Sequence, residues 1–191
     1  VIIKNALTAN EASKTLDLLW DYLENLGTGI DRTNPLTWSD DKWPTCAHGG
    51  IIPSYGIGHS EAQWFVRGVP NVKKAFAKVW ETDDLLTSFD GVSLWRPWNV
   101  DQSWKTQSGQ AWFHIDQHPI SKPGKQCIQG LINLLPTSKE IGGNVVIPKS
   151  HNFFKDIPEE YKERVERLPL DIDHFRFPHD DPKLSSEPAV M

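Results

Sequence analysis

The sequence predicts an α+β fold in which helices come first and strands follow. Helical patterns occur at residues 8–26 and 60–81, and from about residue 90 the chain carries short apolar segments bounded by Gly, Pro, Ser and Asn. This strand spacing is typical of an all-β barrel or jelly roll, with the helices packed outside it. We therefore expect a single domain over 1–191, helical to about residue 88 and jelly-roll-like from about 90.

Composition narrows the class of partner. The chain has 191 residues, which is enough to bury one hydrophobic core. Its net charge of -5 argues against nucleic acid or an anionic membrane as the main partner. It also contains nine tryptophans. Cys46 and Cys127 form neither a disulfide framework nor a zinc-type pair. No run of about 18 apolar residues is present. We expect a cytoplasmic protein that binds a small molecule, in a pocket that tryptophans help to line.

Residues 8–26 are predicted to form the first helix. Thr8 and Glu11 have the spacing of a capping box, and Gly27 is typical of the position just after a helix. Its apolar face consists of four leucines at helical spacing, Leu16, Leu19, Leu23 and Leu26.

Further helices are predicted on the same grounds. Ser60 begins a short helix that ends near Arg67, and Pro70 stands near the first turn of a helix over 70–81. The remaining two are a short helix at 83–88 and a charged helix at about 158–168.

Residues 28–58 are rich in Gly, Pro, Thr and Trp and form a long irregular segment. Such segments in compact domains are often lids or binding loops. We therefore expect this one to contribute to a ligand site.

Strands are predicted where short apolar runs lie between turn residues. The four runs are GVSLWRPW (91–98), QAWFHIDQ (110–117), KQCIQGLINLLP (125–136) and GNVVIP (143–148). The opening VIIKNA also reads as a strand.

His114 and Asp116 are the first candidates for chemistry. On a strand they point to the same face, and one imidazole with one carboxylate supplies two ligands of the 2-His-1-carboxylate iron triad. The pattern alone is weak, because a surface His and Asp on a strand give the same spacing. His179 and Asp181 provide a second match in a proline-flanked loop.

Three motifs in order provide the missing context. WFHIDQ, QGLINLLP and GGNVVIPKSH resemble the phytanoyl-CoA dioxygenase-like family of Fe(II)/2-oxoglutarate oxygenases, with Lys149 where that family usually has Gly. SFDGVSLWRPW and the stretch from Thr28 extend the resemblance over the whole chain. The resemblance implies a double-stranded β-helix core with flanking N-terminal helices.

The resemblance also implies a ligand set. His114 and Asp116 would hold Fe(II), and a second His would follow a Gly-Asp turn in a late strand. No segment between His151 and Met191 has that pattern. We therefore expect the third His beyond residue 191, the last strands to be missing, and the chain to be a fragment or a natural truncation.

Other side chains are candidates for the 2-oxoglutarate site. Gln129 and Asn133 share one face of the strand predicted at 125–136. Two amides on an apolar strand need hydrogen-bond partners, and these two could bind the carboxylates of 2-oxoglutarate. That face of the strand could instead be the one exposed to solvent. Arg96 could anchor a carboxylate or stack on Trp95 or Trp98.

Trp98 and Trp112 are expected to wall the substrate pocket, Trp112 because it lies on the same face of its strand as the ligand pair. His118 is excluded from a helical HxxxH zinc pair by Pro119 and the strand context. In the family the His of the IP-x-SH turn, here His151, is not a ligand.

The expected activity is Fe(II)/2-oxoglutarate-dependent hydroxylation of a small organic molecule, with 2-oxoglutarate converted to succinate and CO2. The retained Asp116 argues against a halogenase. Two alternatives remain. One is a truncated, non-catalytic jelly-roll binding module. The other is a cupin-like metal hydrolase or isomerase that uses His114, Asp116 and either His151 or His174 with Zn2+ or Mn2+.

Overall fold

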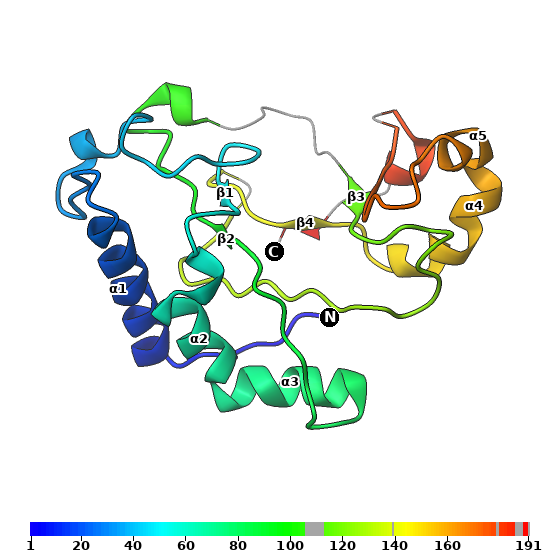
Figure 1. The fold of residues 1–191 in the computed structure, drawn as a ribbon, viewed down its shortest axis with the longest axis horizontal. Helices are drawn as coiled ribbons and strands as arrows, with labels where there is room; N and C mark the ends of the chain where they lie inside the picture. The colour runs from blue at the N-terminus through cyan, green and yellow to red at the C-terminus, as the bar shows by residue number, and fades with distance from the viewer. Residues whose placement is uncertain (106–112, 139, 179, 186–188, 191) are drawn as a thin grey trace. The chain divides into compact units, whose positions relative to one another are not determined.

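The chain divides into two compact units, an N-terminal unit over Val1–Thr106 and a C-terminal unit over Gln107–Met191. The computed structural model describes every residue except 106–112, 139, 179, 186–188 and 191 (Figure 1). The mixed α and β content is confirmed. The expected order of helices before strands is not, because a strand at Ile51–Ile52 precedes two of the N-terminal helices. That the two units make up one domain stays a prediction.

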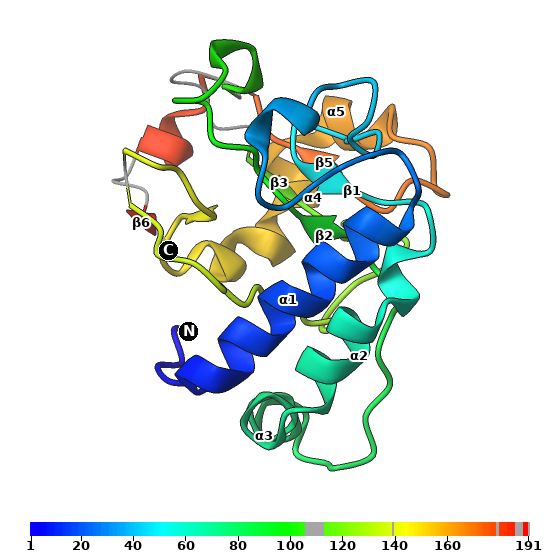
Figure 2. The ribbon, with the colours of Figure 1, turned by 90° about the vertical axis from the view of Figure 1, so that its left-hand side faces the viewer.

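Three helices of the N-terminal unit confirm their sequence predictions. They are α1 (Ala9–Asn25), α2 (Glu61–Gly68) and α3 (Pro70–Trp80), and α1 lies alongside α2 (Figure 2). The capping box of α1 is complete, because the Thr8 hydroxyl accepts from the backbone N–H of Glu11 and the Glu11 carboxylate accepts from that of Thr8. In the part of the chain that is described, no helix is both long and apolar enough to cross a membrane.

The rest of the N-terminal unit packs against these helices through short elements. Strands β1 (Ile51–Ile52) and β2 (Val92–Ser93) pair antiparallel. Gly91 permits this pairing, since a Cβ there would meet the carbonyl oxygen of Ile52 at 2.5 Å. Short 3-10 helices lie at Pro35–Thr37, Ile57–His59 and Gln102–Trp104. The buried core of the unit comprises Leu23, Ile30, Trp43, Ile52 and Ile57.

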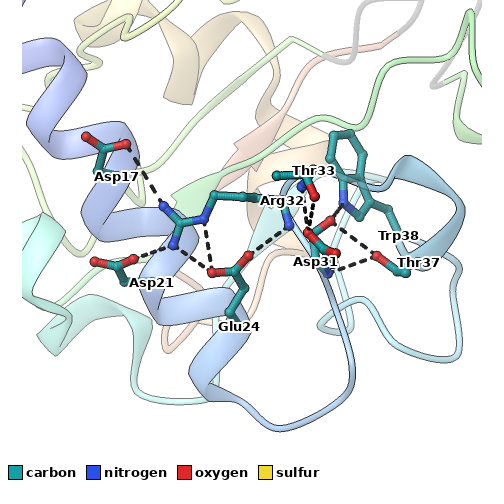
Figure 3. Close-up of polar contacts among 8 residues, drawn as sticks. All are labelled: Asp17, Asp21, Glu24, Asp31, Arg32, Thr33, Thr37 and Trp38. Carbon is teal, nitrogen blue, oxygen red and sulfur yellow. Dashed lines mark hydrogen bonds and ion pairs between the residues drawn. The ribbon is translucent and has the colours of Figure 1, made fainter.

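Arg32 ties the segment after α1 back onto that helix (Figure 3). Its guanidinium forms ion pairs with Asp17, Asp21 and Glu24, three carboxylates on the last turns of α1. Glu24 also accepts from the backbone N–H of Arg32 at 2.8 Å. We call these four residues the Arg32 clamp.

The residues on either side of Arg32 are bonded locally as well. Asp31 accepts from the backbone N–H and hydroxyl of Thr33, and its own N–H donates to the Thr37 hydroxyl at 2.9 Å. The Trp38 indole N–H donates to the Asp31 carbonyl at 2.8 Å. The first part of the irregular segment 28–58 is therefore fixed, and its role in ligand binding stays a prediction.

The C-terminal unit is built on two antiparallel strand pairs. β3 (His114–Ile115) pairs with β5 (Phe175–Arg176), and β4 (Val145–Val146) pairs with β6 (Ala189–Val190). The helical elements are a 3-10 helix at Ser150–Asp156, α4 (Ile157–Glu160), α5 (Lys162–Glu166) and a 3-10 helix at Pro182–Ser185. Its core consists of Ile157, Val165 and Phe175, with Ile115, Phe154, Tyr161, Leu168 and Phe177 around them.

The structure does not show the double-stranded β-helix. The described strands have two residues each and form three separate two-stranded sheets. The strand predicted at 125–136 is absent, and its apolar residues Ile128, Leu131 and Leu135 are exposed. A strand needs a neighbouring edge for its backbone hydrogen bonds, and the described residues offer this segment none.

Three smaller expectations also differ. Residues 1–3 form no strand and are exposed, and no helix forms at 83–88. A segment that short lacks the length to stabilise an isolated helix. The helix predicted at about 158–168 is split into α4 and α5 at Tyr161, whose φ of -115° and ψ of 33° leave the helical region.

Asp181, from the second H-x-D match, has a structural partner. It is 8% exposed, and its carboxylate accepts from the Tyr161 hydroxyl at 2.5 Å and from the backbone N–H of Lys183 at 2.9 Å. Tyr161 in turn packs edge-on against Phe175 and Phe177. The pair therefore fastens the chain around Asp181 to the C-terminal core.

Tyr161→Phe should flatten the alkaline limb of the stability profile. Burial, followed by the hydrogen bond and charge of Asp181, raises the pKa of Tyr161. Because the folded-state pKa lies above the unfolded value of about 10, stability is full below that pH and is lost as pH rises above it. Urea midpoints measured from neutral to alkaline pH should fall more steeply for the wild type than for the variant. Tyr55→Phe is the control, and parallel curves for Tyr161→Phe and the wild type would contradict this account.

Candidate metal centre

His114 and Asp116 come together at one end of β3. The distance between His114 Nε2 and Asp116 Oδ1 is 3.3 Å. Ile115, between them, packs against the C-terminal core, so strand alternation directs its two neighbours to the opposite face. Both side chains are partly exposed, His114 at 28% and Asp116 at 43%. The shared face predicted from the sequence agrees with this arrangement.

Pairing with β5 fixes the backbone that carries the pair. His114 stands opposite Arg176 and Ile115 opposite Phe175, and the N–H of Phe177 donates to the carbonyl of Phe113 at 3.1 Å. Phe175 is 1% exposed. The side of the strand that faces away from the ligand pair is therefore anchored in the core.

Gln129 holds the carboxylate from its other side. Its side-chain amide donates to Asp116 Oδ2 at 2.8 Å, while Oδ1 lies next to His114. Hydrogen bonds of this kind orient a carboxylate ligand. Sequence analysis placed Gln129 at 2-oxoglutarate, and that role stays a prediction beside the contact observed.

The electrostatics of the pair favour an ionised Asp116. The hydrogen bond from His114 lowers the pKa of Asp116 most, burial opposes it, and Gln129 together with the charges of His114 and His174 lowers it further. A carboxylate that is already deprotonated at neutral pH can accept a cation without releasing a proton.

The turn directly after the pair was not predicted from the sequence. Gln117 donates its side-chain amide to the carbonyls of Lys122 and Gly124, and His118 is fully buried. The run DQHPISKPG, with two prolines and a glycine, was the signal for a structured turn in the sequence.

The other predicted site residues lie elsewhere or are not described. Asn133 donates to the Thr137 hydroxyl at 3.4 Å. Arg96 and Trp98 belong to the N-terminal unit. Trp112 lies outside the described residues. Their roles toward cosubstrate or substrate stay predictions.

Arg96 is engaged within its own unit. Its guanidinium donates to the Trp38 carbonyl at 2.6 Å and to Asp40 at 2.5 Å, and it lies 4.6 Å from the ring centre of Trp104. Trp98 has the Lys105 ammonium 4.8 Å from its ring centre. Arg96 thus lies over Trp104, whereas the sequence predicted stacking on Trp95 or Trp98.

The described residues include the two side chains that were predicted as ligands of an iron triad, and their ligand role stays a prediction. His114 and Asp116 provide the imidazole and carboxylate that Fe(II) favours in oxygenases. Among the residues that can be described, no group of three or more His, Cys, Asp or Glu could hold a metal ion. His151 and His174 are exposed and do not complete such a group, so the cupin-like alternative gains no support.

Comparisons with known proteins find two relatives. The chain is 33% identical over 177 residues to "Ava biosynthesis cluster protein O" of Aspergillus versicolor, covering 93% of this chain and 55% of the relative. It is 26% identical over 192 residues to "Putative phytanoyl-CoA dioxygenase" of Dictyostelium discoideum, covering 82% of this chain and 53% of the relative.

The chain thus spans about half the length of the curated relatives it matches. No family model matches the chain. No solved structure matches it either. The resemblance inferred from the three motifs is confirmed as distant homology.

Proposed function

We propose that this chain, a distant homologue of a phytanoyl-CoA dioxygenase-type protein, belongs to an Fe(II)/2-oxoglutarate-dependent dioxygenase that hydroxylates a small organic molecule. The observation that carries the proposal is the approach of His114 Nε2 and Asp116 Oδ1 to 3.3 Å at the end of β3. A His and an Asp brought together on a strand, with an amide on the carboxylate, form an arrangement suited to metal binding.

His114 and Asp116 are the residues that would hold the metal. Fe(II) with 2-oxoglutarate supplies, when bound, the oxidising power to hydroxylate a C–H bond with O2. The chain's own contribution is positional. Gln129 fixes the Asp116 carboxylate, the β3–β5 pairing fixes His114, and the lowered pKa of Asp116 keeps that ligand ionised.

Two observations support a small organic substrate. The net charge of -5 does not suit a polyanionic substrate, and one relative is named for a fungal biosynthesis cluster. We extend the connection with biosynthesis in that name to this chain and propose a small molecule as its substrate.

A non-catalytic binding module is the second candidate. It is favoured by one observation, that the described residues provide two ligands and no third. The two candidates differ in what they require of the metal. The dioxygenase needs bound Fe(II) that accepts 2-oxoglutarate, whereas the binding module needs neither.

Anaerobic titration of the purified chain with Fe(II) and 2-oxoglutarate separates them. The dioxygenase predicts a weak visible charge-transfer band that requires both components and saturates near one iron per chain. His114→Ala should abolish the band, because it removes one of the two described ligands. Exposed His151 provides the matched control, and His151→Ala should leave the band unchanged.

The opposite outcomes are equally clear. A chain that is folded by circular dichroism but gives no band would show that residues 1–191 do not form a competent iron site by themselves, which is what the binding module requires. A band that survives His114→Ala but disappears in His151→Ala would move the metal to a different ligand set.

A further inference from the structure

The backbone on the far side of Asp116 from β3 is held by a short, densely bonded turn. His118–Lys122 closes on itself, because the backbone N–H of Lys122 donates to the carbonyl of His118 at 3.1 Å. We call these residues the His118 turn. Gln117, which joins it to Asp116, donates its side-chain amide to the carbonyls of Lys122 at 2.5 Å and Gly124 at 2.6 Å.

The His118 turn is also bonded to the segment before β5. The Ser121 hydroxyl donates to the Leu170 carbonyl at 3.2 Å, and Lys122 forms an ion pair with Asp173. Asp116 therefore stands between two fixed flanks. β3 precedes it, and the turn that follows is attached to the chain leading into β5.

His118 organises this turn from inside. It is 0% exposed, and its Nδ1 accepts the backbone N–H groups of Ile120 at 3.1 Å and Ser121 at 3.0 Å. Asn and Asp side chains at turns and helix N-caps use the same arrangement, accepting from N–H groups two and three residues ahead. His118 fills that role with a ring nitrogen.

The two accepted bonds also determine the state of the ring. Because Nδ1 uses its lone pair, the proton of the neutral imidazole sits on Nε2. Nε2 is buried and has no hydrogen-bond partner among the described residues. Histidines that bind metals normally donate from the nitrogen that does not face the metal. A ring whose Nδ1 accepts two bonds is therefore unsuited to be the missing ligand.

We propose that His118 is a positioning residue for the His114–Asp116 pair, acting through Nδ1 and the turn that Nδ1 closes. As a role in metal binding, this inference rests on the proposed function. The histidine holds the backbone after Asp116, so that the carboxylate stays between His114 and Gln129. Nε2 makes no contribution to this role.

Paired substitutions distinguish the contribution of Nδ1 from that of Nε2. His118→Asn places an acceptor near the position of Nδ1, and His118→Gln places an amide near that of Nε2. His118→Ala removes both. Ser121→Ala is the matched control, since it removes the hydroxyl bond to Leu170 and keeps the backbone N–H that His118 accepts.

The first readout needs no metal. Hydrogen exchange followed by NMR measures the exchange rates of the backbone amides of Ile120 and Ser121 and of the side-chain amide of Gln129. The Gln129 amide reports on the position of Asp116, because it donates to that carboxylate. His118→Asn should retain protection at all three. His118→Ala and His118→Gln should speed exchange by about tenfold or more, while Ser121→Ala should leave Gln129 protected.

The second readout is the affinity for Co(II), used as an air-stable probe of the Fe(II) site. His118→Ala and His118→Gln should weaken it about 10- to 100-fold, as loss of an outer-shell partner does. His118→Asn and Ser121→Ala should remain within about threefold of the wild type, well short of that loss.

Three results would overturn the inference. Gln129 could stay protected in both His118→Gln and His118→Ala. His118→Asn could lose Co(II) affinity while its turn amides stay protected, which would transfer the role to Nε2. His118→Gln could retain wild-type affinity. A wild-type chain that binds no Co(II) would count against the proposed function, and the exchange data would still decide the role of His118.

Discussion

Asp116→Asn should reduce the affinity of the chain for Fe(II) by more than about 100-fold, because a loss at the metal itself should exceed the 10- to 100-fold effect of outer-shell changes. The substitution keeps the size of the side chain and leaves Gln129 an oxygen to donate to. It removes the negative charge that the lowered pKa of Asp116 maintains. Anaerobic titration with Fe(II), with the chelate band as signal, measures the change.

Gln129→Leu and His151→Ala serve as comparisons for the loss of Fe(II) affinity in Asp116→Asn. Gln129→Leu removes only the amide bond to Asp116 Oδ2, so we expect a loss of about 10-fold. His151 is exposed and belongs to no group of metal-binding side chains among the described residues, so His151→Ala should leave the Fe(II) affinity unchanged. Equal affinities for Asp116→Asn and wild type would show that the metal, if bound, does not use this pair.

Phe175→Ala should lower the free energy of unfolding of the C-terminal unit by about 3–5 kcal/mol, the range measured for buried Phe. Phe175 is 1% exposed, stands opposite Ile115 in the β3–β5 pair and packs edge-on against Tyr161 and Phe177. Small domains have only about 5–15 kcal/mol of stability. The variant should therefore unfold at much lower urea concentration.

The metal site should weaken in the same variant, because β5 holds the strand that carries His114. Leu170→Ala is the control from the same unit. Its side chain is 68% exposed, so the change in unfolding free energy should stay within about 0.5 kcal/mol. Similar urea midpoints for both variants would mean that the C-terminal core does not depend on Phe175.

The helices of the N-terminal unit could be predicted because local chemistry determines them. The capping box at Thr8, the N-cap at Ser60 and the proline at residue 70 each act within a few residues, and each stands where expected. The split of the later charged helix at Tyr161 was not predictable in this way. Tyr161 takes part in a contact twenty residues away, with Asp181.

The strands could be predicted as apolar segments but not as a sheet. Short apolar runs between turn residues located β2, β3 and β4, yet a strand exists only where a partner edge meets it. Residues 125–136 have the composition of a strand and remain exposed. Their backbone pairing depends on a partner that composition does not specify.

Sequence spacing likewise predicts one feature of the candidate site and not the others. The shared face of His114 and Asp116 follows from the two-residue period of a strand, and the short distance between their side chains agrees with it. The bond from Gln129 to Asp116 depends on how separate segments fold back. The Nδ1 bonds of His118 reach only two and three residues ahead, but they put a ring nitrogen where turns usually use Asn or Asp. No spacing rule along the chain predicts them.

The Arg32 clamp should keep the segment after α1 attached to that helix at high pH and release it at low pH. Hydrogen bonds to Glu24 and Asp21 raise the pKa of Arg32, so alkaline buffers leave its charge in place. Hydrogen bonds from Arg32 lower the pKa of Glu24, so the clamp contributes stability above the ordinary Glu value and loses it as pH falls through the lowered one. Asp17 and Asp21 are largely exposed, at 70% and 56%, and salt screens their share. Acidic, high-salt buffers are therefore the conditions under which this segment detaches first.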